Sequence, residues 1–551
     1  MMRVFTSILI VLCVIASHAQ TDSTKTGEII SGEVVIEKNK EILLPKADKI
    51  FLRSVPKSFL NQPLNLTFDV KEPSFEWPDY KSDVPFQSIE ETYPKAQYQN
   101  YIKAGYGNFS SPLLEVGFFK MFGDFDTKAR LFYESFKSGP VNGDNSGSSD
   151  GGIQLSSTYK SKTIAITPLL SFRSRTYRFY GNSDRVNTGF DSTRSPKVLL
   201  NNLAFSIGLK GGNEDISYSI KPHFSFINED ESDSPLFNEE STIGVNGMFN
   251  YGIDDSFTTG FDLEGLSSSY DGGISYSRSL INVNPWVKYK KDNLLIKAGF
   301  ILSSGKVADD SKTGFYPDVR VDYDLSDKWL IYGILSGGQT WNGLQELLNE
   351  NEFLDDSLAI SHVEYTYKFG GGIKGSPIKN LLFDASLISS STKGLPFFVP
   401  SINDSSRYNL AYDTEPVNII SLKSSVSYMP TATSMYGASL EINGYSVKTL
   451  DRPWNRPTYI FKAHTSHNIK ERIIVSAYLS SMGGIRSPAN VNFGYVNLSA
   501  FVDVGLGAKY LITERASAFI DVNNLLNNEY ERYLGYPTRG LAFKIGGQYR
   551  F

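Results

Sequence analysis

Cysteine is almost absent from this sequence of 551 residues, since its one cysteine, Cys13, lies within the first 19 residues. If that segment is removed, disulfides, thiol catalysis and cysteine metal sites are excluded for the rest of the chain. Apolar runs are short as well: after residue 19 none approaches the roughly 20 residues that a transmembrane helix needs. Basic charge is not in excess, because the formal net charge is −5. That balance does not favour a nucleic-acid partner, which requires a basic face.

The first 19 residues have the organisation of a secretory signal peptide. Arg3 supplies the positive charge at the start, the segment 8–16 is apolar, and Ser17 and Ala19 place small residues before a cleavage site. A lipoprotein signal would need a small residue where Leu12 precedes the cysteine. The sequence therefore predicts export by the Sec pathway and removal of this segment.

From residue 97 to residue 551 the sequence repeats one unit, a stretch of alternating polarity of about ten residues followed by a connection. In the segment 496–510 the even positions are apolar, while polar residues such as Asp503 and Lys509 occupy the odd positions. The pattern recurs in four other segments: 164–175, 256–264, 294–303 and 473–480. In a membrane barrel the apolar face meets lipid and the polar face lines the lumen.

The connections distinguish a membrane barrel from a soluble sandwich. Every second connection is short, with turns near Gly123, Asp254 and Thr513 among others. Most of the alternate connections are long: 138–150, 181–196, 228–240, 305–313, 340–357, 394–407 and 524–539. Short periplasmic turns and long extracellular loops are typical of outer-membrane barrels. We therefore predict an all-β protein, a transmembrane antiparallel β-barrel of about 22 strands in the cell outer membrane.

Residues 20–96 have a different composition. Seven of the 24 prolines lie between Pro45 and Pro94, and regular alternation is missing. We expect an extended arm that is periplasmic or fills the lumen. The predicted organisation is a signal peptide at 1–19, this proline-rich arm at 20–96 and the barrel at 97–551.

The last predicted strand ends at the C-terminal residue. Phe543, Ile545, Tyr549 and Phe551 share one face, and polar residues share the other. A terminal aromatic residue on an alternating last strand resembles the signal that bacterial barrels present to their assembly machinery. We expect these four residues to form that signal; the other interpretation is an ordinary strand at the end of a domain.

The residues before this strand resemble a motif of the TonB-dependent receptor superfamily. The segment 521–530, with Asn524, Leu525 and Tyr530, is similar to the family's Asn-Leu-Phe-Asp-like turn that is followed by Tyr. The segment 535–540 resembles the family's Pro-Gly-Arg element, through three residues: Pro537, Arg539 and Gly540.

This resemblance has departures and a limit. Leu526 stands where the family has Phe, and the order of the Pro-Gly-Arg element is changed. The segment 341–348 also resembles the family's loop before a middle strand. The resemblance implies a 22-stranded barrel, but family members carry a folded plug ahead of the barrel, and residues 20–96 do not resemble one. Something else must then fill the lumen: the arm, folded-in loops or a partner chain.

No motif for a nucleophile, a zinc site or a phosphate loop is found, so neither enzyme activity nor a cofactor is expected. His464 and His467 are three apart on a predicted strand and point to opposite faces, so they do not form a metal pair. The acidic segment 228–233 lacks the glycine-anchored spacing of a Ca²⁺ loop, which favours a solvated loop. Charges on the lumen face are interpreted as a solvated interior: Arg173, Arg175, Asp262, Glu264, Asp503 and Lys509.

Three functions remain open. The resemblance implies transport or ligand reception across the outer membrane, with coupling to TonB undecided. Without a plug, the chain could instead be a structural subunit of a larger outer-membrane assembly, and a passive porin is the third alternative. The expected partners are outer-membrane lipid, the barrel-assembly machinery, and a periplasmic or outer-membrane protein if no segment of this chain fills the lumen.

Overall fold

The computed structural model describes residues 100–141, 143–181, 195–213, 215–232, 237–402, 404, 406–489 and 494–551. These residues belong to the second of two compact units, Phe75–Phe551. The predicted signal peptide and N-terminal arm lie outside the described residues.

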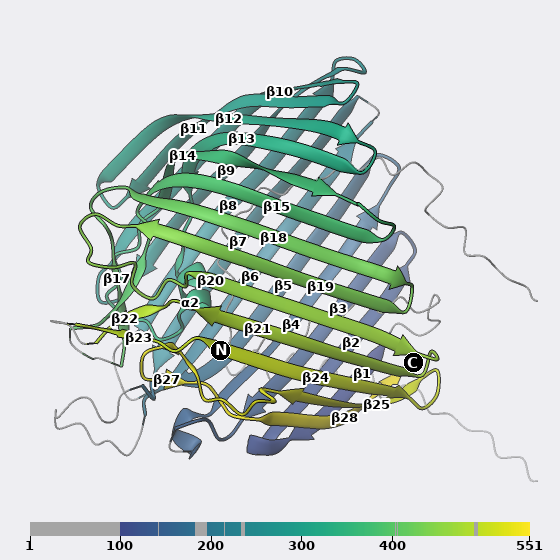
Figure 1. Cartoon of the computed structure of the whole chain (residues 1–551), viewed down its shortest axis with the longest axis vertical. Coiled ribbons are helices and arrows are strands. Elements are labelled where there is room, and N and C mark those ends of the chain that lie inside the picture. The colour runs from purple at the N-terminus through teal and green to yellow at the C-terminus, as the bar shows by residue number, and fades with distance from the viewer. Residues whose placement is uncertain are drawn as a thin grey trace, which may run out of the picture. The chain divides into compact units, whose positions relative to one another are not determined.

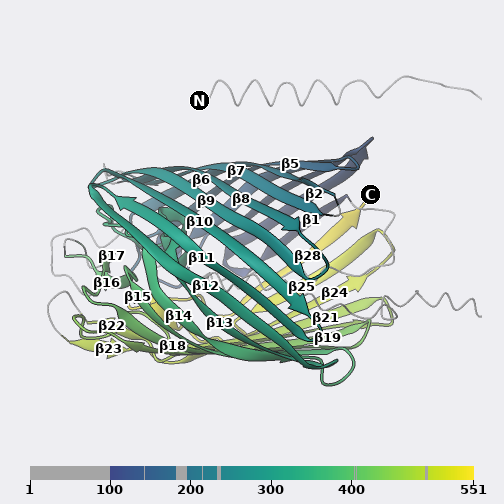
Figure 2. The ribbon, with the colours of Figure 1, turned by 90° about the horizontal axis from the view of Figure 1, so that it is seen from above.

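One antiparallel sheet of 22 strands closes on itself (Figures 1 and 2). Each strand pairs with its neighbours in chain order, and the last strand pairs with the first, with Tyr101 opposite Arg550 and Gly107 opposite Lys544. The ring consists of β1 (Tyr101–Gly107), β2 (Ser111–Phe122), β3 (Phe125–Phe136), β4 (Ser148–Lys160), β5 (Ile164–Arg178), β6 (Lys197–Gly212), β7 (Ile216–Glu231), β8 (Phe237–Gly252), β9 (Phe257–Asp271), β10 (Tyr276–Lys291), β11 (Leu294–Val307), β12 (Asp310–Ser326), β13 (Trp329–Thr340), β14 (Val363–Gly375), β15 (Leu381–Lys393), β18 (Val417–Thr431), β19 (Ser434–Ser446), β20 (Tyr459–Ile469), β21 (Ile473–Gly483), β24 (Phe501–Leu511), β25 (Ala516–Asn523) and β28 (Ala542–Arg550). The predicted barrel and its strand number are confirmed.

The remaining elements are short and lie in the connections. They are the 3-10 helices η2 (Asn108–Ser110) and η3 (Gly143–Ser146), the helix α2 (Leu344–Glu350), and the hairpins β16–β17 (Phe397–Pro400, Tyr408–Ala411), β22–β23 (Arg486–Pro488, Tyr495–Asn497) and β26–β27 (Glu531–Tyr533, Tyr536–Pro537).

Apolar side chains cover the outer face of the ring, as lipid requires. On β24, Val502 and Leu506 are exposed, while Asp503 between them is buried on the inner side. On β6, Leu203 and Phe205 are likewise exposed. In the described part of the chain, no helix is long and apolar enough to cross a membrane. The closed sheet with its apolar outer face is an outer-membrane barrel.

The two rims differ as the alternation of connections predicts. Connections after even-numbered strands of the ring are tight turns, such as 123–124, 161–163, 292–293 and 432–433. The longer connections all lie at the other rim: between β3 and β4, β5 and β6, β13 and β14, β15 and β18, β19 and β20, β21 and β24, and β25 and β28.

Two predicted long loops, 228–240 and 305–313, are wrong. β7 continues to Glu231 and β8 begins at Phe237, while β11 reaches Val307 and β12 begins at Asp310. These strand ends have few apolar residues on their outer side, because they extend past the apolar band, and their polar composition is that of a loop.

The predicted strand at 496–510 is wrong in its first part. β24 begins at Phe501, and Tyr495–Asn497 is the separate strand β23. The reason is that Leu498 turns into a buried cluster, where its N–H donates to the Ile485 carbonyl at 3.0 Å.

Candidate functional site

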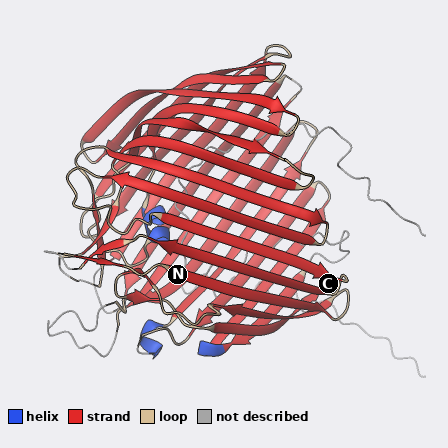
Figure 3. Cartoon of the chain, in the orientation of Figure 1, coloured by secondary structure: helices blue, strands red, loops and turns tan. Residues whose placement is uncertain are grey.

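The long connections fold over the mouth of the barrel at the loop-bearing rim. We call residues 341–362, between β13 and β14, the strap, and the strap together with the three small hairpins the cap. In Figure 3 the helix α2 of the strap lies within the ring of strands. One buried apolar cluster joins strands of the wall to the cap: Tyr177, Phe179, Val198, Leu200, Ile227, Tyr270, Leu344, Leu347, Leu348, Phe353, Leu354, Leu358, Ile360, Phe398, Tyr408, Tyr533 and Tyr536.

β-Bulges at the base of the strap direct it inward. The register of β13 against β14 shifts between Ser336 and Gly338, and Gly338 has a φ of 122°, a conformation that favours glycine. The register of β14 against β15 shifts between Tyr365 and Tyr367. Because a bulge bends its strand, both strands that carry the strap are re-aimed at the same level.

The N-terminal part of the strap is attached to β8 and β10 by a buried ion pair. The Arg278 guanidinium pairs with the Glu240 carboxylate, and their side chains are 0% and 3% exposed. Arg278 Nη1 donates to the Asn342 carbonyl at 2.6 Å, and the Leu344 N–H donates to Glu240 Oε2 at 2.6 Å. The guanidinium also lies over the Trp341 ring, 4.6 Å from its centroid. Buried charges need such partners, so this pair fixes the start of α2 to the wall.

The C-terminal end of α2 is attached to the opposite side of the mouth. Arg456, in the connection between β19 and β20, pairs with the buried Glu350 carboxylate and also donates to the Pro396 carbonyl. Tyr533 donates to the Glu350 carbonyl at 2.9 Å. Burial raises the pKa of Glu350, although the charge of Arg456 lowers it. Since β19 and β20 stand about halfway around the ring from β8, the strap crosses the mouth.

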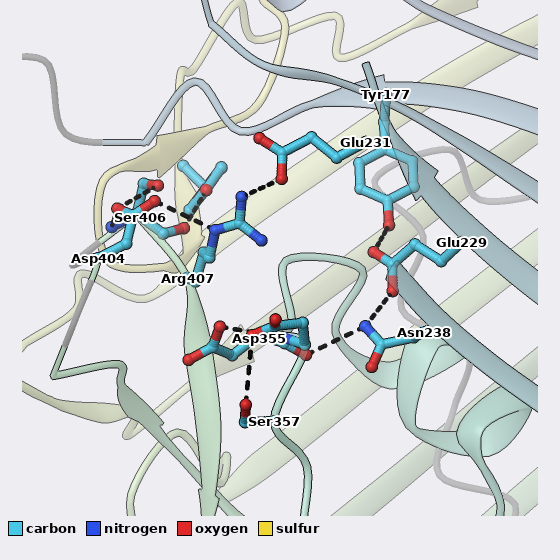
Figure 4. Close-up of polar contacts among 11 residues, drawn as sticks. Tyr177, Glu229, Glu231, Asn238, Asp355, Ser357, Asp404, Ser406 and Arg407 are labelled. Carbon is cyan, nitrogen blue, oxygen red and sulfur yellow. Dashed lines mark hydrogen bonds and ion pairs between the residues drawn. The ribbon is translucent and has the colours of Figure 1, made fainter. Parts of the chain in front are cut away.

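A polar network attaches the second half of the strap (Figure 4). Tyr177 on β5 donates to Glu229 Oε1 on β7 at 2.5 Å. Asn238 Nδ2 on β8 donates to Glu229 Oε2 at 2.6 Å and to the Asp355 carbonyl of the strap at 3.1 Å. Close by, Arg407 pairs with Glu231 and with Asp404, the latter at 3.1 Å. The wall, the strap and the segment before β17 are therefore one bonded unit.

The motif residue Asn524 organises the base of the last long loop. Its side chain donates to the Asn528 and Arg539 carbonyls, both at 2.7 Å, and accepts the Asn528 N–H at 3.1 Å. Its φ is 47°, which asparagine tolerates. Tyr530 donates to Asp503 Oδ2 at 2.9 Å and stacks on Phe501, with ring centroids 3.9 Å apart.

The other motif residues fall in the same loop. The Pro537 carbonyl accepts from the Tyr180 hydroxyl at 3.2 Å, and Arg539 Nη2 donates to the Ser148 hydroxyl at 2.6 Å. A Cβ atom at Gly540 would lie 2.4 Å from Asn527 Oδ1, so a larger residue there would displace the Asn527 side chain. Leu525 is 41% exposed and is not part of the buried cap. In this structure the motif serves to fold the last loop.

The four residues of the expected assembly signal lie together on the outer face of β28 and at the C-terminus. Phe543, Ile545, Tyr549 and Phe551 are all exposed. The Phe551 N–H donates to the Asn100 carbonyl at 2.9 Å, which places the two ends of the barrel side by side. Recognition of these four residues by the assembly machinery stays a prediction.

Charged groups of the inner wall bind neighbouring charged or polar side chains. The six predicted lumen charges all have partners: Arg173 with Asp150, Arg175 with Glu352, Lys297 with Asp262, Asn282 with Glu264, Tyr530 with Asp503, and Lys509 with Gln548. Glu229 and Glu231 of the acidic segment have separate partners in the network above, so they do not form a joint cation site. Within the described ranges no group of three His, Cys, Asp or Glu residues could hold a metal ion.

Comparison with known proteins identifies the fold. No protein-family model matches the sequence, and no curated protein matches it. Among solved structures, the FrpB iron transporter from Neisseria meningitidis (F3-3 variant) has a TM-score of 0.67 at 10% identity, over 83% of this chain and 82% of that chain. The ferric-catecholate import receptor Fiu from E. coli has 0.62 at 10% identity, over 83% and 82%. The copper transporter OprC has 0.60 at 12% identity, over 83% and 81%.

The barrel has the fold of the TonB-dependent receptors. The fold that the resemblance of the last loop implies is thus confirmed for the barrel. The sequence alone did not reveal the cap. A local signal of it is the spacing of Leu344, Leu347 and Leu348, which places three leucines on one helical face.

Proposed function

We propose that this chain is an outer-membrane transporter or receptor whose ligand enters at the capped mouth. The observation that carries the proposal is a wide, polar-walled barrel with the strap across its loop-bearing rim. A 22-stranded barrel is far wider than a small solute needs, and such barrels are obstructed rather than open. A bulky ligand and a regulated opening are consistent with both features.

The cap argues against a passive porin. A porin has an aqueous channel through the whole barrel, whereas buried ion pairs and an apolar cluster hold α2 across this mouth. The competing hypothesis is a structural subunit of an outer-membrane assembly, for which a closed mouth is equally suitable.

Deletion of the gene followed by uptake measurements separates these hypotheses. We expect the deletion strain to lose uptake of one class of bulky solute. The solutes tested should include iron and copper chelates, because the similar structures are described as iron, ferric-catecholate and copper transporters or receptors. The control is the deletion strain carrying the wild-type gene. Normal uptake of every solute, together with stoichiometric outer-membrane partners after gentle extraction, would favour the subunit hypothesis instead.

Dependence on energy coupling is tested in the same strains. If the chain is coupled as the similar fold suggests, removal of the TonB system should abolish the uptake that this chain supports. Uptake that persists without that system would show that the ligand passes by another route or without coupling.

A further inference from the structure

The strap has the features of a gate rather than of an ordinary surface loop. It is bound to both sides of the mouth, at Glu240 and Arg278 on one side and at Arg456 on the other. Its three leucines on α2 are each no more than 1% exposed. A surface loop would lack both the buried charges and the buried apolar face.

The second half of the strap adds hydrogen bonds to the wall and to the adjacent hairpin. The Tyr408 N–H donates to the Phe353 carbonyl at 2.7 Å, and the Asp355 N–H donates to the Tyr408 carbonyl at 2.8 Å. Tyr276 on β10 donates to the Leu358 carbonyl at 2.8 Å. The strap therefore joins the wall at β10 to the β16–β17 hairpin of the cap.

Below the strap, several charged groups of the inner wall pair with one another. The Lys297 Nζ atom lies 3.6 Å from Asp262 Oδ2 and 3.4 Å from Asp318 Oδ2. The Lys423 Nζ atom lies 3.5 Å from Glu441 Oε2. Such a wall does not require a salt-bridged occupant to compensate its charges. Water beneath the cap is consistent with these polar, paired groups.

We propose that the strap is the gate of this barrel: it seals the mouth while it is clamped to both walls, and its release opens a continuous aqueous path. This inference deepens the proposed function, since it names the barrier that a ligand must displace. It does not depend on that function, because sealing can be measured without any ligand.

Conductance in a planar bilayer tests the gate directly. Four forms are compared: the mature chain, a form with 344–350 replaced by a Gly-Ser segment of equal length, a form without residues 20–96, and the combination. We expect the mature chain and the form without the arm to be silent, and both forms without α2 to show large, steady conductance. Conductance on removal of the arm alone, or silence of the α2 replacement while the combination conducts, would overturn the proposal.

A disulfide provides a test that leaves the sequence of the strap almost intact. A Cβ atom at Gly273, in the β9–β10 turn, would lie 3.1 Å from the Ser357 Cβ atom, so a small separation of the turn and the strap brings the pair to the Cβ–Cβ distance of about 3.5–4.5 Å found in disulfides. The mature chain predicted by the signal peptide has no other cysteine. We therefore propose the Gly273→Cys, Ser357→Cys variant, with each single cysteine variant as a matched control.

Urea below the concentration that unfolds the barrel should detach the strap and produce conductance in the mature chain and in both single variants. The oxidised double variant should stay silent, and reduction should restore its conductance. Equal urea-induced conductance in the oxidised and reduced double variant, with the disulfide verified by mass, would refute the strap as the gate. Heat-dependent migration in SDS gels confirms that each form contains a folded barrel.

Discussion

Replacing Arg278 by methionine should loosen the strap. The Arg278 side chain is 0% exposed and is the ion-pair partner of Glu240. Methionine retains part of the volume but leaves the Glu240 carboxylate buried with no countercharge, although the Leu344 N–H still donates to it. Removing one partner of a buried ion pair costs about 3–5 kcal/mol. That cost is paid only while the strap is docked, so it shifts the equilibrium toward the detached strap.

The shift can be read from hydrogen exchange at two amides of α2 and its C-terminus. The Leu347 N–H donates to the Gly343 carbonyl at 3.1 Å, and the Asn351 N–H donates to the Leu347 carbonyl at 2.8 Å. Since about 1.36 kcal/mol corresponds to a factor of ten, we expect their protection factors to fall roughly 150-fold to 5,000-fold. Exchange measured by mass spectrometry in detergent resolves such a change.

Arg130→Met is the matched control. Arg130 also faces the lumen and pairs with Glu115 at 2.8 Å, but its side chain is 49% exposed. An exposed pair contributes at most about 1 kcal/mol, and this pair has no contact with the strap. If the Leu347 and Asn351 amides of Arg278→Met keep their protection from hydrogen exchange while the barrel is intact, the Arg278–Glu240 ion pair does not hold the strap in place.

Three further predictions follow from single side chains. Leu347→Ala should destabilise docking of the strap by about 2–5 kcal/mol through the cavity it leaves, and protease cleavage within the strap should accelerate; unaltered cleavage would contradict the buried cluster. Burial would raise the pKa of Asp413, but hydrogen bonds from neighbouring backbone N–H groups lower it to about 2. These hydrogen bonds to the Asp413 carboxylate therefore stabilise its loop above about pH 4, and their contribution is lost as the pH falls toward 2. A change in Trp454 fluorescence over this pH range should follow the loss, and it should be absent in Asp413→Asn. Phe551→Ser should lower the amount of barrel in the outer membrane, while Gln548→Ser should not, as measured by the heat-modifiable band.

The fold could be predicted because lipid and water impose opposite demands on alternate residues. Where a strand has lipid on one side and the lumen on the other, as at Val502 and Asp503, the polarity of each residue indicates which face of the strand it occupies. The alternation of short and long connections then gave the two rims. The predicted loops at 228–240 and 305–313 are wrong because the strands extend past the lipid there, where polarity no longer distinguishes the two faces of a strand.

The cap could not be predicted in the same way, because its decisive contacts join residues that are far apart in the chain. Nothing near Glu240 in the sequence indicates that its partner is Arg278, and nothing near Glu350 indicates Arg456. Either glutamate taken alone is typical of a solvated surface position. Only the closed ring brings each carboxylate to its guanidinium, so the gate depends on the fold in a way that a local pattern does not record.

One sequence feature does mark where the lumen ends and the cap begins. Within the lumen the inward positions are polar, but at the mouth they become apolar because they pack against the cap. The change produces adjacent apolar residues on opposite faces: Leu199 is 37% exposed while Leu200 is 2% exposed, and Leu280 is 0% exposed while Ile281 is 53% exposed. In an open pore the inward member of each pair would meet water and would be polar. Such apolar pairs at the loop-side ends of several strands therefore indicate, from sequence alone, a barrel whose own loops close its mouth.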